Sequence, residues 1–571
     1  MCFILEHMHQ TCQNCKTDFI IDERDQDYYK KIHVPHPTWC SQCRIQRRLS
    51  THNVWNVYWR NCTKCEKRTL SMYNPEVPIA VYCPKCWWAD DWDGTEYAMD
   101  YDPTRHFFEQ VYELSRKTPW VSQEVIAPTM VNSEYCNGAS YLRNCYLTFW
   151  ADYCENVTHS SMIIHLKDSS DCLRANESEL CYGSIGMNKS YHVFFSEESE
   201  ACTDIWFSRN LSNCTNCVGC VNLRGESYCI FNEKYSKEDY FAKLKEFRID
   251  TFEGLESLQK QAHAFWLTKP YRFYSGNSMN LQVTGEYVFG SKNSQDVYLC
   301  NGTEESRYCQ FITVPSAKEC YDYSGWGANV ELLYETHSSG ENVNNVKFSY
   351  CAYTDSMNVE YSIWTIAGKN NFGCVNLKRK KFCILNKEYP EEEYYALKAK
   401  IIEDMKNNPY IDPQGRVWGY GETFPLMMSL FGYNETTAFR FFPKTKEQAI
   451  QQGFNWYDAV LPDHAATIQS ADLPQTIQET ENSVTDEVIE CRECHRGYKI
   501  GPLEVTLLRK MNIPVPHSCP KCRMNYRFSR LNPMQLWDRN CMKCNDAITT
   551  AFSPERPETI YCAKCYQQEV S

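Results

Sequence analysis

The chain has 571 residues and a net charge of −13, and 43% of its residues are hydrophobic. This composition excludes a disordered protein, and the length exceeds that of one ordinary domain. No apolar run approaches the roughly 18 residues of a membrane span, and residues 1–15 do not resemble a secretory signal, so we expect a cytoplasmic protein without a membrane partner. The 33 cysteines then indicate metal binding or packing rather than disulfides.

Near each end, the sequence carries a module of eight cysteines in four Cys-x-x-Cys pairs. The intervals between successive pairs are identical in the two modules, so a single offset of 479 aligns them without a gap. Other residues match at the same offset, for example Arg60-Asn61 with Arg539-Asn540. A repeat of this quality marks one structural unit used twice. The sixteen cysteines are Cys12, Cys15, Cys40, Cys43, Cys62, Cys65, Cys83, Cys86, Cys491, Cys494, Cys519, Cys522, Cys541, Cys544, Cys562 and Cys565.

The spacing of these pairs predicts four structural zinc ions. Two cysteines separated by two residues can both bind one ion, and two such pairs complete a tetrahedral Cys₄ shell with no open position for catalysis. Sequential pairing of neighbouring pairs gives two zinc ribbons in series, and a cross-brace joins first to third and second to fourth. The long segment between Arg44 and Asn61 favours sequential pairing, but both arrangements stay open. We place the modules, zinc-ribbon or treble-clef-like, at residues 1–100 and 491–571.

The central region has a second cysteine pattern. Cys136, Cys145, Cys154, Cys172 and Cys181 fall on a nine-residue spacing, with Ile163 in the one empty slot, and the spacing returns at Cys202, Leu211, Cys220 and Cys229. Polar, turn-rich segments surround these positions, which is typical of stacked short strands. We predict a β-solenoid, similar to a β-helix, over residues 125–232, with two nine-residue passes making one coil of about 18 residues. Residues 220–232 match residues 374–386 at an offset of 154, which predicts a second, less regular solenoid over 275–387.

The remaining segments connect these parts. We predict a helix and connection at 101–124, a helical connector at 233–274, a helix with an irregular segment at 388–460, and a linker at 461–490. The fold class is therefore mainly β with some α, with zinc modules at both ends flanking two solenoids that helices join. The interior cysteines are interpreted as small packing residues. Cys214, Cys217 and Cys220 resemble part of an iron–sulfur ligand set, which leaves metal binding there as an alternative.

Three arginines follow the second cysteine pair of each module. Residues 1–90 carry a net charge of +3 and residues 491–571 of +6, so the middle carries −22. On a helix such arginines can follow phosphates, which predicts nucleic-acid binding. Alternatively, they pair with the acidic middle and hold the ends against it. The residues are Arg44, Arg47, Arg48, Arg523, Arg527 and Arg530.

Several motifs resemble those of a known group, uncharacterised zinc-ribbon proteins of candidate-phyla bacteria with a Cys/Tyr/Asn-rich central region. The motifs are Tyr82-Cys83-Pro84-Lys85-Cys86-Trp87-Trp88, Gly219-Cys220-Val221-Asn222-Leu223-Arg224, Phe431-Gly432-Tyr433-Asn434, and Pro554-Glu555-Arg556-Pro557-Glu558 with Tyr561-Cys562. The resemblance covers essentially the whole chain. It implies the architecture described above and carries no activity over to this chain.

Two functions follow as hypotheses. The first is a non-enzymatic zinc-binding scaffold whose modules contact a protein or nucleic acid. The second is an enzyme with paired carboxylates in a solenoid groove, acting on carbohydrate. The sequence contains no phosphate-binding loop, dinucleotide fingerprint, His-Glu-x-x-His motif or nucleophile elbow. It therefore favours the scaffold, nominates no catalytic residue and identifies no small-molecule substrate.

Overall fold

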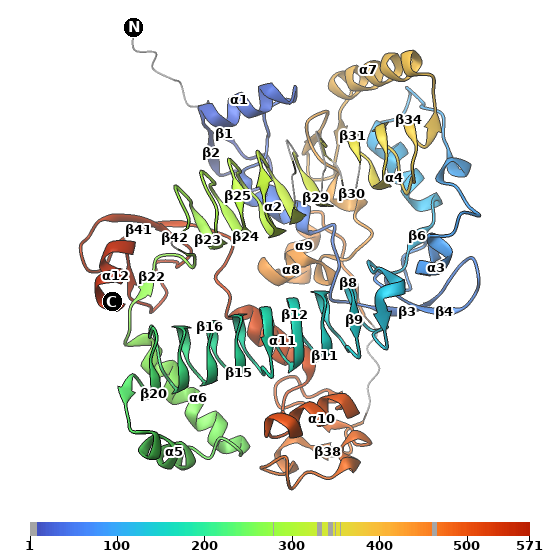
Figure 1. Ribbon diagram of the computed structural model, residues 1–571. Coiled ribbons are helices and arrows are strands. Elements are labelled where there is room, and N and C mark those ends of the chain that lie inside the picture. Colours follow the sequence, from blue (N-terminus) through green and yellow to red (C-terminus); the bar gives the residue numbers. More distant parts are fainter. Residues whose placement is uncertain are drawn as a thin grey trace.

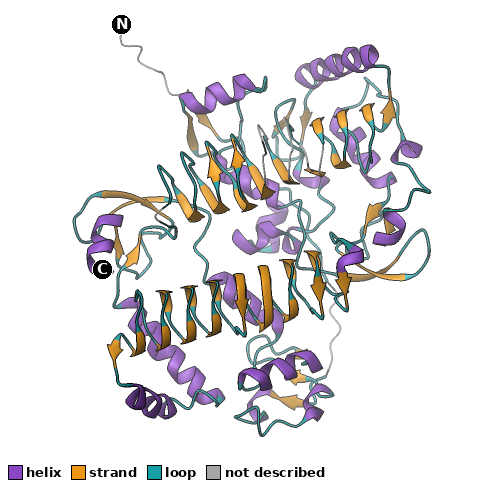
Figure 2. Cartoon of the chain, viewed as in Figure 1, coloured by secondary structure: helices purple, strands orange, loops and turns teal. Residues whose placement is uncertain are grey.

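A computed structural model describes residues 8–277, 279–327, 330, 334–340, 346–348, 350–353, 356–459 and 465–570. The protein is mainly β with some α, as predicted. Two rows of short strands run side by side, and helices fill the space between them and cover the ends (Figures 1 and 2). We call the rows the first strand stack (residues 125–232) and the second strand stack (residues 275–387). No helix among the described residues combines the length and apolarity of a membrane span.

The two cysteine modules have the same order of elements. The N-terminal module contains β1 (Met8–Thr11), β2 (Asp18–Ile21), α1 (Glu23–Lys31), α2 (Ser41–Leu49), β3 (Tyr58–Asn61), β4 (Arg68–Ser71), β5 (Val81–Tyr82) and α3 (Pro84–Trp87). The C-terminal module contains β39 (Ile489–Glu490), β40 (Gly497–Tyr498), α10 (Pro502–Met511), α11 (Pro520–Ser529), β41 (Trp537–Asn540), β42 (Ala547–Thr550), β43 (Ile560–Tyr561) and α12 (Ala563–Val570). The duplication seen in the sequence is therefore a duplication of structure.

In the first stack, the strands between residues 130 and 230 pair in parallel with the segment one turn later, and residues 233–234, directly after the stack, pair antiparallel with the last of these strands. Thr158 pairs with Ser170, for example, and their hydroxyls share a hydrogen bond across an interval of 12 residues. The strands are β7 (Met130–Val131), β8 (Asn137–Ser140), β9 (Leu142–Arg143), β10 (Phe149–Asp152), β11 (Glu155–Thr158), β12 (Ser161–Ser170), β13 (Leu173–Glu179), β14 (Ile185–Asn188), β15 (Tyr191–Phe194), β16 (Glu197–Glu200), β17 (Thr203–Trp206), β18 (Arg209–Ser212), β19 (Thr215–Val218), β20 (Ser227–Ile230) and β21 (Glu233–Lys234). The predicted coil of two nine-residue passes is therefore wrong, because the true turn is shorter.

The shortest structural repeat within a turn of the first stack is a triplet of residues. From Gly138 to Phe231, every third residue has a positive φ between 44° and 72°. This left-handed conformation turns the chain at a corner, and four such triplets make one turn. Every third residue from Cys136 to Cys220 is buried, because one residue of each triplet faces the interior. The nine-residue cysteine spacing is thus three triplets, and cysteine is one of several small residues at interior positions.

Serine side chains join successive turns of the stack. The hydroxyl of Ser160 accepts a hydrogen bond from the backbone N–H of Cys172 at 3.0 Å, 12 residues later. Ser208 accepts from Cys220 in the same way, also at 3.0 Å. A corner residue in the left-handed conformation leaves backbone groups without a partner in its own triplet, and these hydroxyls satisfy some of them.

The second stack repeats this design with irregular turns. Gly285 pairs with Val297, which is the regular interval, but Gln310 pairs with Ser324, 14 residues later. The turn from Tyr323 to Thr336 is also longer than a regular one. The strands are β23 (Gly285–Phe289), β24 (Val297–Asn301), β25 (Thr303–Glu304), β26 (Gln310–Val314), β27 (Ala317–Lys318), β28 (Tyr323–Gly327), β29 (Thr336–Gly340), β30 (Tyr350–Tyr353), β31 (Met357–Glu360), β32 (Ile363–Ile366), β33 (Lys369–Phe372), β34 (Lys381–Ile384) and β35 (Lys387–Glu388). Extra residues in these turns explain why the cysteine spacing drifts there.

The connecting segments pack on the stacks. They contain α4 (Phe107–Lys117), β6 (Trp120–Val121), α5 (Lys237–Glu246), α6 (Phe252–Leu267), β22 (Tyr271–Arg272), α7 (Glu391–Asn407), β36 (Tyr410–Ile411), β37 (Val417–Trp418), α8 (Thr437–Phe441), α9 (Lys446–Gln451) and β38 (Ile468–Gln469). Of the predicted linker 461–490, residues 461–464 lie outside the described residues. Its remainder buries Leu473, Ile477 and Val484 against the C-terminal module, so that part is anchored.

Candidate metal centres

The structure gathers the sixteen module cysteines into four groups of four. In each group, the Sγ atoms all lie within 4.8 Å of one another. The groups combine neighbouring pairs, as the sequential alternative predicts: Cys12, Cys15, Cys40 and Cys43; Cys62, Cys65, Cys83 and Cys86; Cys491, Cys494, Cys519 and Cys522; and Cys541, Cys544, Cys562 and Cys565. None of the cysteines named here forms a disulfide. Each group can hold one metal ion.

The sulfur spacing fits a tetrahedral ion. Sulfurs about 2.3 Å from a central zinc ion lie about 3.8 Å apart. The Sγ atoms of Cys15 and Cys40 are 3.7 Å apart, and those of Cys494 and Cys519 are 3.8 Å apart. In the second and fourth groups, the corresponding distances are 4.0 Å and 3.7 Å. All four groups therefore have the size of a Cys₄ metal shell.

The first pair of each group lies on a tight turn. The N–H of Cys12 donates to the carbonyl of Thr17 at 2.9 Å, and the N–H of Lys16 donates to the carbonyl of Cys12 at 3.0 Å. Lys16 has a φ of 63°, which is the left-handed conformation. The other three groups repeat these bonds, and their equivalent residues, Glu66, His495 and Asn545, also have positive φ. The local fold therefore directs both sulfurs of each first pair to one point.

The second pair of each group lies at the start of a helix. Cys40, Cys83 and Cys519 directly precede α2, α3 and α11, and α12 begins after Cys562. The backbone N–H of Cys562 donates to the Sγ of Cys541 at 3.2 Å. Burial opposes ionisation of Cys541, but N–H groups of Cys544, Cys562 and Lys543 lower the pKa of its thiol to about 6. Such donors stabilise the thiolate that a metal ion requires.

The first centre has a network of polar contacts that sequence reasoning missed. Asn14 donates to the Sγ of Cys43 at 3.3 Å, and its side-chain oxygen accepts from Arg416 at 2.9 Å. Gln13 exchanges two hydrogen bonds with the backbone of Val417, at 2.8 and 3.1 Å. Arg416 lies 402 residues beyond Asn14 in the sequence, so only the fold brings them together. The equivalent of Asn14 in the third centre is Glu493.

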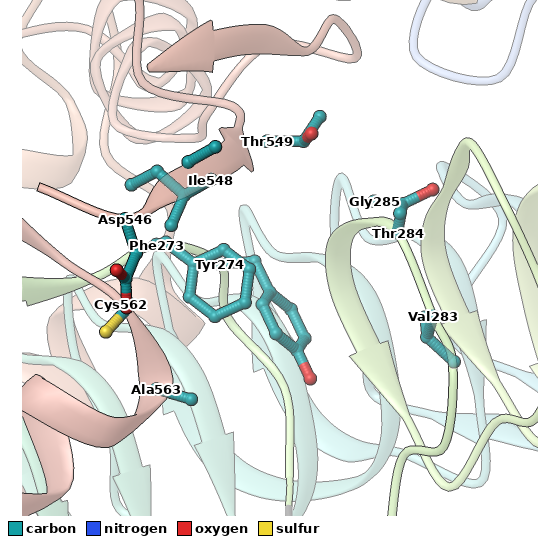
Figure 3. A pocket seen from close by; sticks show the side chains of 11 residues that line it. Phe273, Tyr274, Val283, Thr284, Gly285, Asp546, Ile548, Thr549, Cys562 and Ala563 are labelled. Atoms are coloured by element: carbon teal, nitrogen blue, oxygen red, sulfur yellow. The ribbon is translucent and has the colours of Figure 1, made fainter. Parts of the chain in front are cut away.

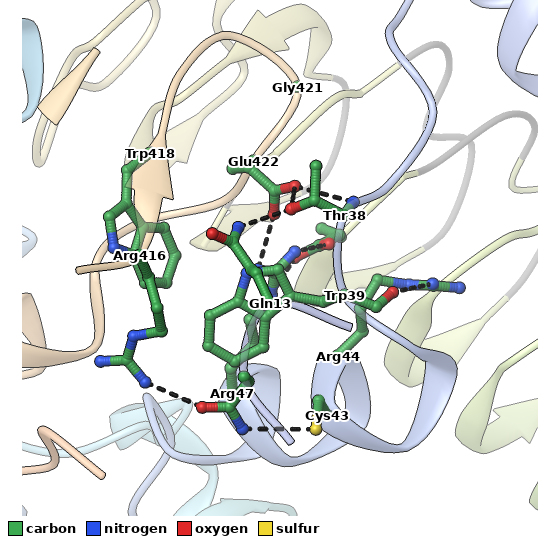
Figure 4. Close-up of polar contacts among 12 residues, drawn as sticks. Gln13, Thr38, Trp39, Cys43, Arg44, Arg47, Arg416, Trp418, Gly421 and Glu422 are labelled. Atoms are coloured by element: carbon green, nitrogen blue, oxygen red, sulfur yellow. Dashed lines mark hydrogen bonds and ion pairs between the residues drawn. The ribbon is translucent and has the colours of Figure 1, made fainter. Parts of the chain in front are cut away.

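The arginines of the N-terminal module are buried in ion pairs with the second stack. Arg44 and Arg48 contact Asp322 at 3.0 and 2.7 Å, and both side chains are at most 3% exposed. Arg47 pairs with Glu335 and, at 2.7 Å, with Glu422 (Figure 4). None of these three guanidinium groups lies where a phosphate backbone can reach it. They hold the module against the acidic middle, which was the other interpretation of these residues.

The C-terminal module docks on the first stack in the same way. Arg523 and Arg527 contact Asp171 at 2.9 and 2.6 Å, and their side chains are 9% and 5% exposed. Arg530 pairs with Glu197 at 2.7 Å and is 32% exposed. Five of the six arginines predicted to bind nucleic acid are therefore internal, and the sixth already has a carboxylate partner.

Each module contacts both stacks. The N-terminal module contacts the second stack through Asp322 and the first stack through Trp55, whose indole N–H donates to the hydroxyl of Ser161 at 3.1 Å. The C-terminal module contacts the first stack through Asp171 and the second stack through Asn532, which donates to the carboxyl group of Glu286 at 2.9 Å. The two modules thus link the two rows of strands at both ends.

The other predicted site residues do not form a fifth group. Cys214, Cys217 and Cys220 occupy successive interior positions of the first stack and are fully buried. Among the described residues, they are not part of a cluster with metal-ligand spacing. Asp171 and Asp322, two buried carboxylates of the middle, pair with arginines of the modules. No protein-family model matches the chain, and no curated protein is detectably similar to it.

Proposed function

We propose that the protein is a non-enzymatic scaffold that binds four structural zinc ions and presents its modules to a protein partner. The sulfur spacing in the four Cys₄ groups is the observation that carries this proposal. Zinc fits because it favours tetrahedral thiolate shells and needs no particular redox state. Four thiolates leave no open coordination position, which supports a structural rather than a catalytic role.

The strand stacks supply the rigid part of the proposed scaffold. Parallel pairing at a regular interval and a filled interior support the predicted β-solenoid architecture. Because each module contacts both stacks, its metal ions would fix the relative position of the two rows. The proposal therefore assigns the zinc ions a role in the shape of the whole molecule as well as in the folding of each module.

Elemental analysis of protein purified without chelator tests this function. We expect four zinc ions per chain, and removal of zinc with a strong chelator should unfold the modules, as followed by circular dichroism. Two or fewer ions in a protein that remains folded would contradict the proposal. Iron with visible absorbance would contradict the choice of zinc as the metal.

A further inference from the structure

A cavity of roughly 320 Å³ lies between the C-terminal module and the start of the second stack. Its size is at the lower end of the about 300–1,000 Å³ that small-ligand sites occupy. Hairpin residues Asp546 to Thr549 form one wall, Val283 to Gly285 form the opposite wall, and the rings of Phe273 and Tyr274 lie between them (Figure 3). Cys562, a ligand of the fourth metal centre, also lines the cavity, which therefore combines two aromatic rings with one carboxylate and one edge of that centre.

The first half of the chain has an equivalent of this cavity. The hairpin β41–β42 corresponds to β3–β4, because Asp538 pairs with Thr549 as Trp59 pairs with Leu70. In the stacks, Glu286 corresponds to Asn137. A side-chain oxygen of Glu286 accepts from the backbone N–H of Ser275, and the side-chain oxygen of Asn137 accepts from the backbone N–H of Glu124 in the same way. Thr284 then corresponds to Tyr135, because Thr284 lies two residues before Glu286 and Tyr135 lies two residues before Asn137.

Large side chains fill the equivalent space in the first half. The guanidinium of Arg68 lies 4.1 Å from the ring centre of Trp59. The ring of Trp59 meets that of Tyr135 edge to face at 5.8 Å. The counterparts in the second half are Ala547, Asp538 and Thr284, which are all smaller. The cavity thus lies where the second half lacks an arginine and two aromatic rings.

The charge of the cavity is also reversed. Lys67 and Arg68 of the first half correspond to Asp546 and Ala547, and Trp59 corresponds to Asp538. Thr549 donates to the carboxylate of Asp538 at 3.1 Å, so a second acid lies beside the wall. Arg272 already stacks on Tyr274 at 4.6 Å and donates to the carbonyl of Gly276, so it does not neutralise Asp546. A carboxylate beside aromatic rings attracts a cation.

We propose that this cavity binds a basic side chain, an arginine or lysine, of a partner protein. The cation would contact the carboxylate of Asp546 and the ring of Phe273, in the space that Arg68 occupies in the first half. This assignment goes beyond the proposed scaffold, because it names the chemistry of the partner and the place where it docks.

Calorimetric titration of the full-length, zinc-loaded protein tests the assignment. The probe is a short capped peptide with one arginine, and the same peptide with citrulline is its neutral control. We expect saturable binding of the arginine peptide only, weakened by salt. Asp546→Asn should weaken it by about tenfold, since a hydrogen bond to a charged group contributes roughly that much. Glu555→Gln, at an exposed acid of the same module, should leave it unchanged.

A second variant refills the cavity. Ala547→Arg combined with Thr284→Tyr copies the first half and should abolish peptide binding while four zinc ions remain bound. Equal binding of both peptides, no binding, or binding that Asp546→Asn leaves intact would overturn the proposal. Binding of free spermidine without the arginine peptide would overturn the assignment to a protein partner. Zinc content measured on every sample separates these outcomes from a failure of the proposed scaffold.

Discussion

The two halves of the molecule share their metal centres and docking contacts but differ in what surrounds them. Arg44 and Arg48 hold Asp322 in one half, and their counterparts Arg523 and Arg527 hold Asp171 in the other. Arg47, by contrast, corresponds to Tyr526, which is 45% exposed. The metal centres and docking contacts are common to both halves. Residues that differ between the halves, such as Arg47 and Tyr526, give each half its own properties.

The largest expected difference is between a metal ligand and an interior cysteine. Cys541→Ser should remove one zinc ion and unfold its module, because structural zinc contributes about 10–16 kcal/mol to such units. Cys145→Ala should retain four ions and lower the free energy of unfolding by about 1–3 kcal/mol, as a small core truncation. Elemental analysis and urea denaturation measure both. Zinc loss on Cys145→Ala would contradict the division between the two kinds of cysteine.

The two docking aspartates should differ in cost. Asp322→Asn leaves Arg44 and Arg48 without their carboxylate, which should cost about 3–5 kcal/mol of folding free energy. Asp171→Asn should cost less, because Arg523 keeps its second buried carboxylate, Glu504, at 2.6 Å. Urea denaturation checks the cost, and small-angle scattering should show an expanded molecule if the module detaches. Glu569→Gln, which breaks the exposed pair with Lys543, is the control and should change stability by less than about 1 kcal/mol. Equal costs for the two aspartates would show that Glu504 does not compensate for the loss of Asp171.

The stability of the two halves should depend differently on pH because of Glu286. It is buried, its Oε1 accepts from Asn532 and Ser275, and Oε2 has no hydrogen-bond partner among the described residues. Burial is the main cause that raises the pKa of Glu286 from 4.5 to about 8; the charge of Glu198 adds to the rise, while Asn532 and Arg174 oppose it. The folded protein then holds a proton that the unfolded chain releases, so this residue costs stability as the pH rises from about 4.5 to about 8.

Glu286→Gln should therefore stabilise the protein at pH 9 and change little at pH 4. The expected gain is roughly 2 kcal/mol, measured by urea denaturation at both pH values. Asn137, the equivalent residue of the first half, is already neutral, so Asn137→Gln serves as the control without a pH-dependent effect. A stabilisation that is the same at pH 4 and pH 9 would show that Glu286 does not hold a proton.

The smallest effect concerns the surroundings of the first metal centre. Asn14→Ala removes the donor to the Sγ of Cys43 and leaves the buried pair of Arg416 with Asp412 intact, so zinc affinity at that centre should fall by about tenfold. The third centre has Glu493 in place of Asn14 and should be unaffected. Competition with a chelator, followed by mass spectrometry of peptides alkylated at the released cysteines, separates the two centres. Equal loss at both would mean that Asn14 acts on overall stability and not on its own centre.

The metal centres were the most predictable part of the molecule, because a Cys-x-x-Cys pair is a local signal that forces both sulfurs to one point. The network of Asn14 and Arg416 was not predictable, since its two members lie in distant parts of the sequence. The arginines after each second pair were visible in the sequence, but their partners Asp322 and Asp171 could not be chosen among many acids. Burial in a specific contact is a property of the fold, and composition alone does not reveal it.

The strand stacks were predictable in kind but not in period. Cysteines occupy about every third interior position, so the sequence showed a nine-residue repeat. Serine, alanine and valine occupy the other interior positions, such as Ser160 and Val157, and this variety made the three-residue repeat hard to recognise. The left-handed corners gave little signal, because residues as different as Asn144, Leu147 and Trp150 all adopt positive φ there. Where corner residues are this varied, spacing of buried positions is a better guide than residue type.

A stack whose turns are built of triplets can change its length one layer at a time. Adding four triplets lengthens a stack by one layer, about 4.8 Å, without disturbing its neighbours. The longer turns of the second stack, such as the one from Gln310 to Ser324, show that extra residues are absorbed at a corner. Since the modules attach at fixed layers of both stacks, the number of turns sets the distance between the metal centres. One layer of four triplets is therefore the unit in which this distance can change.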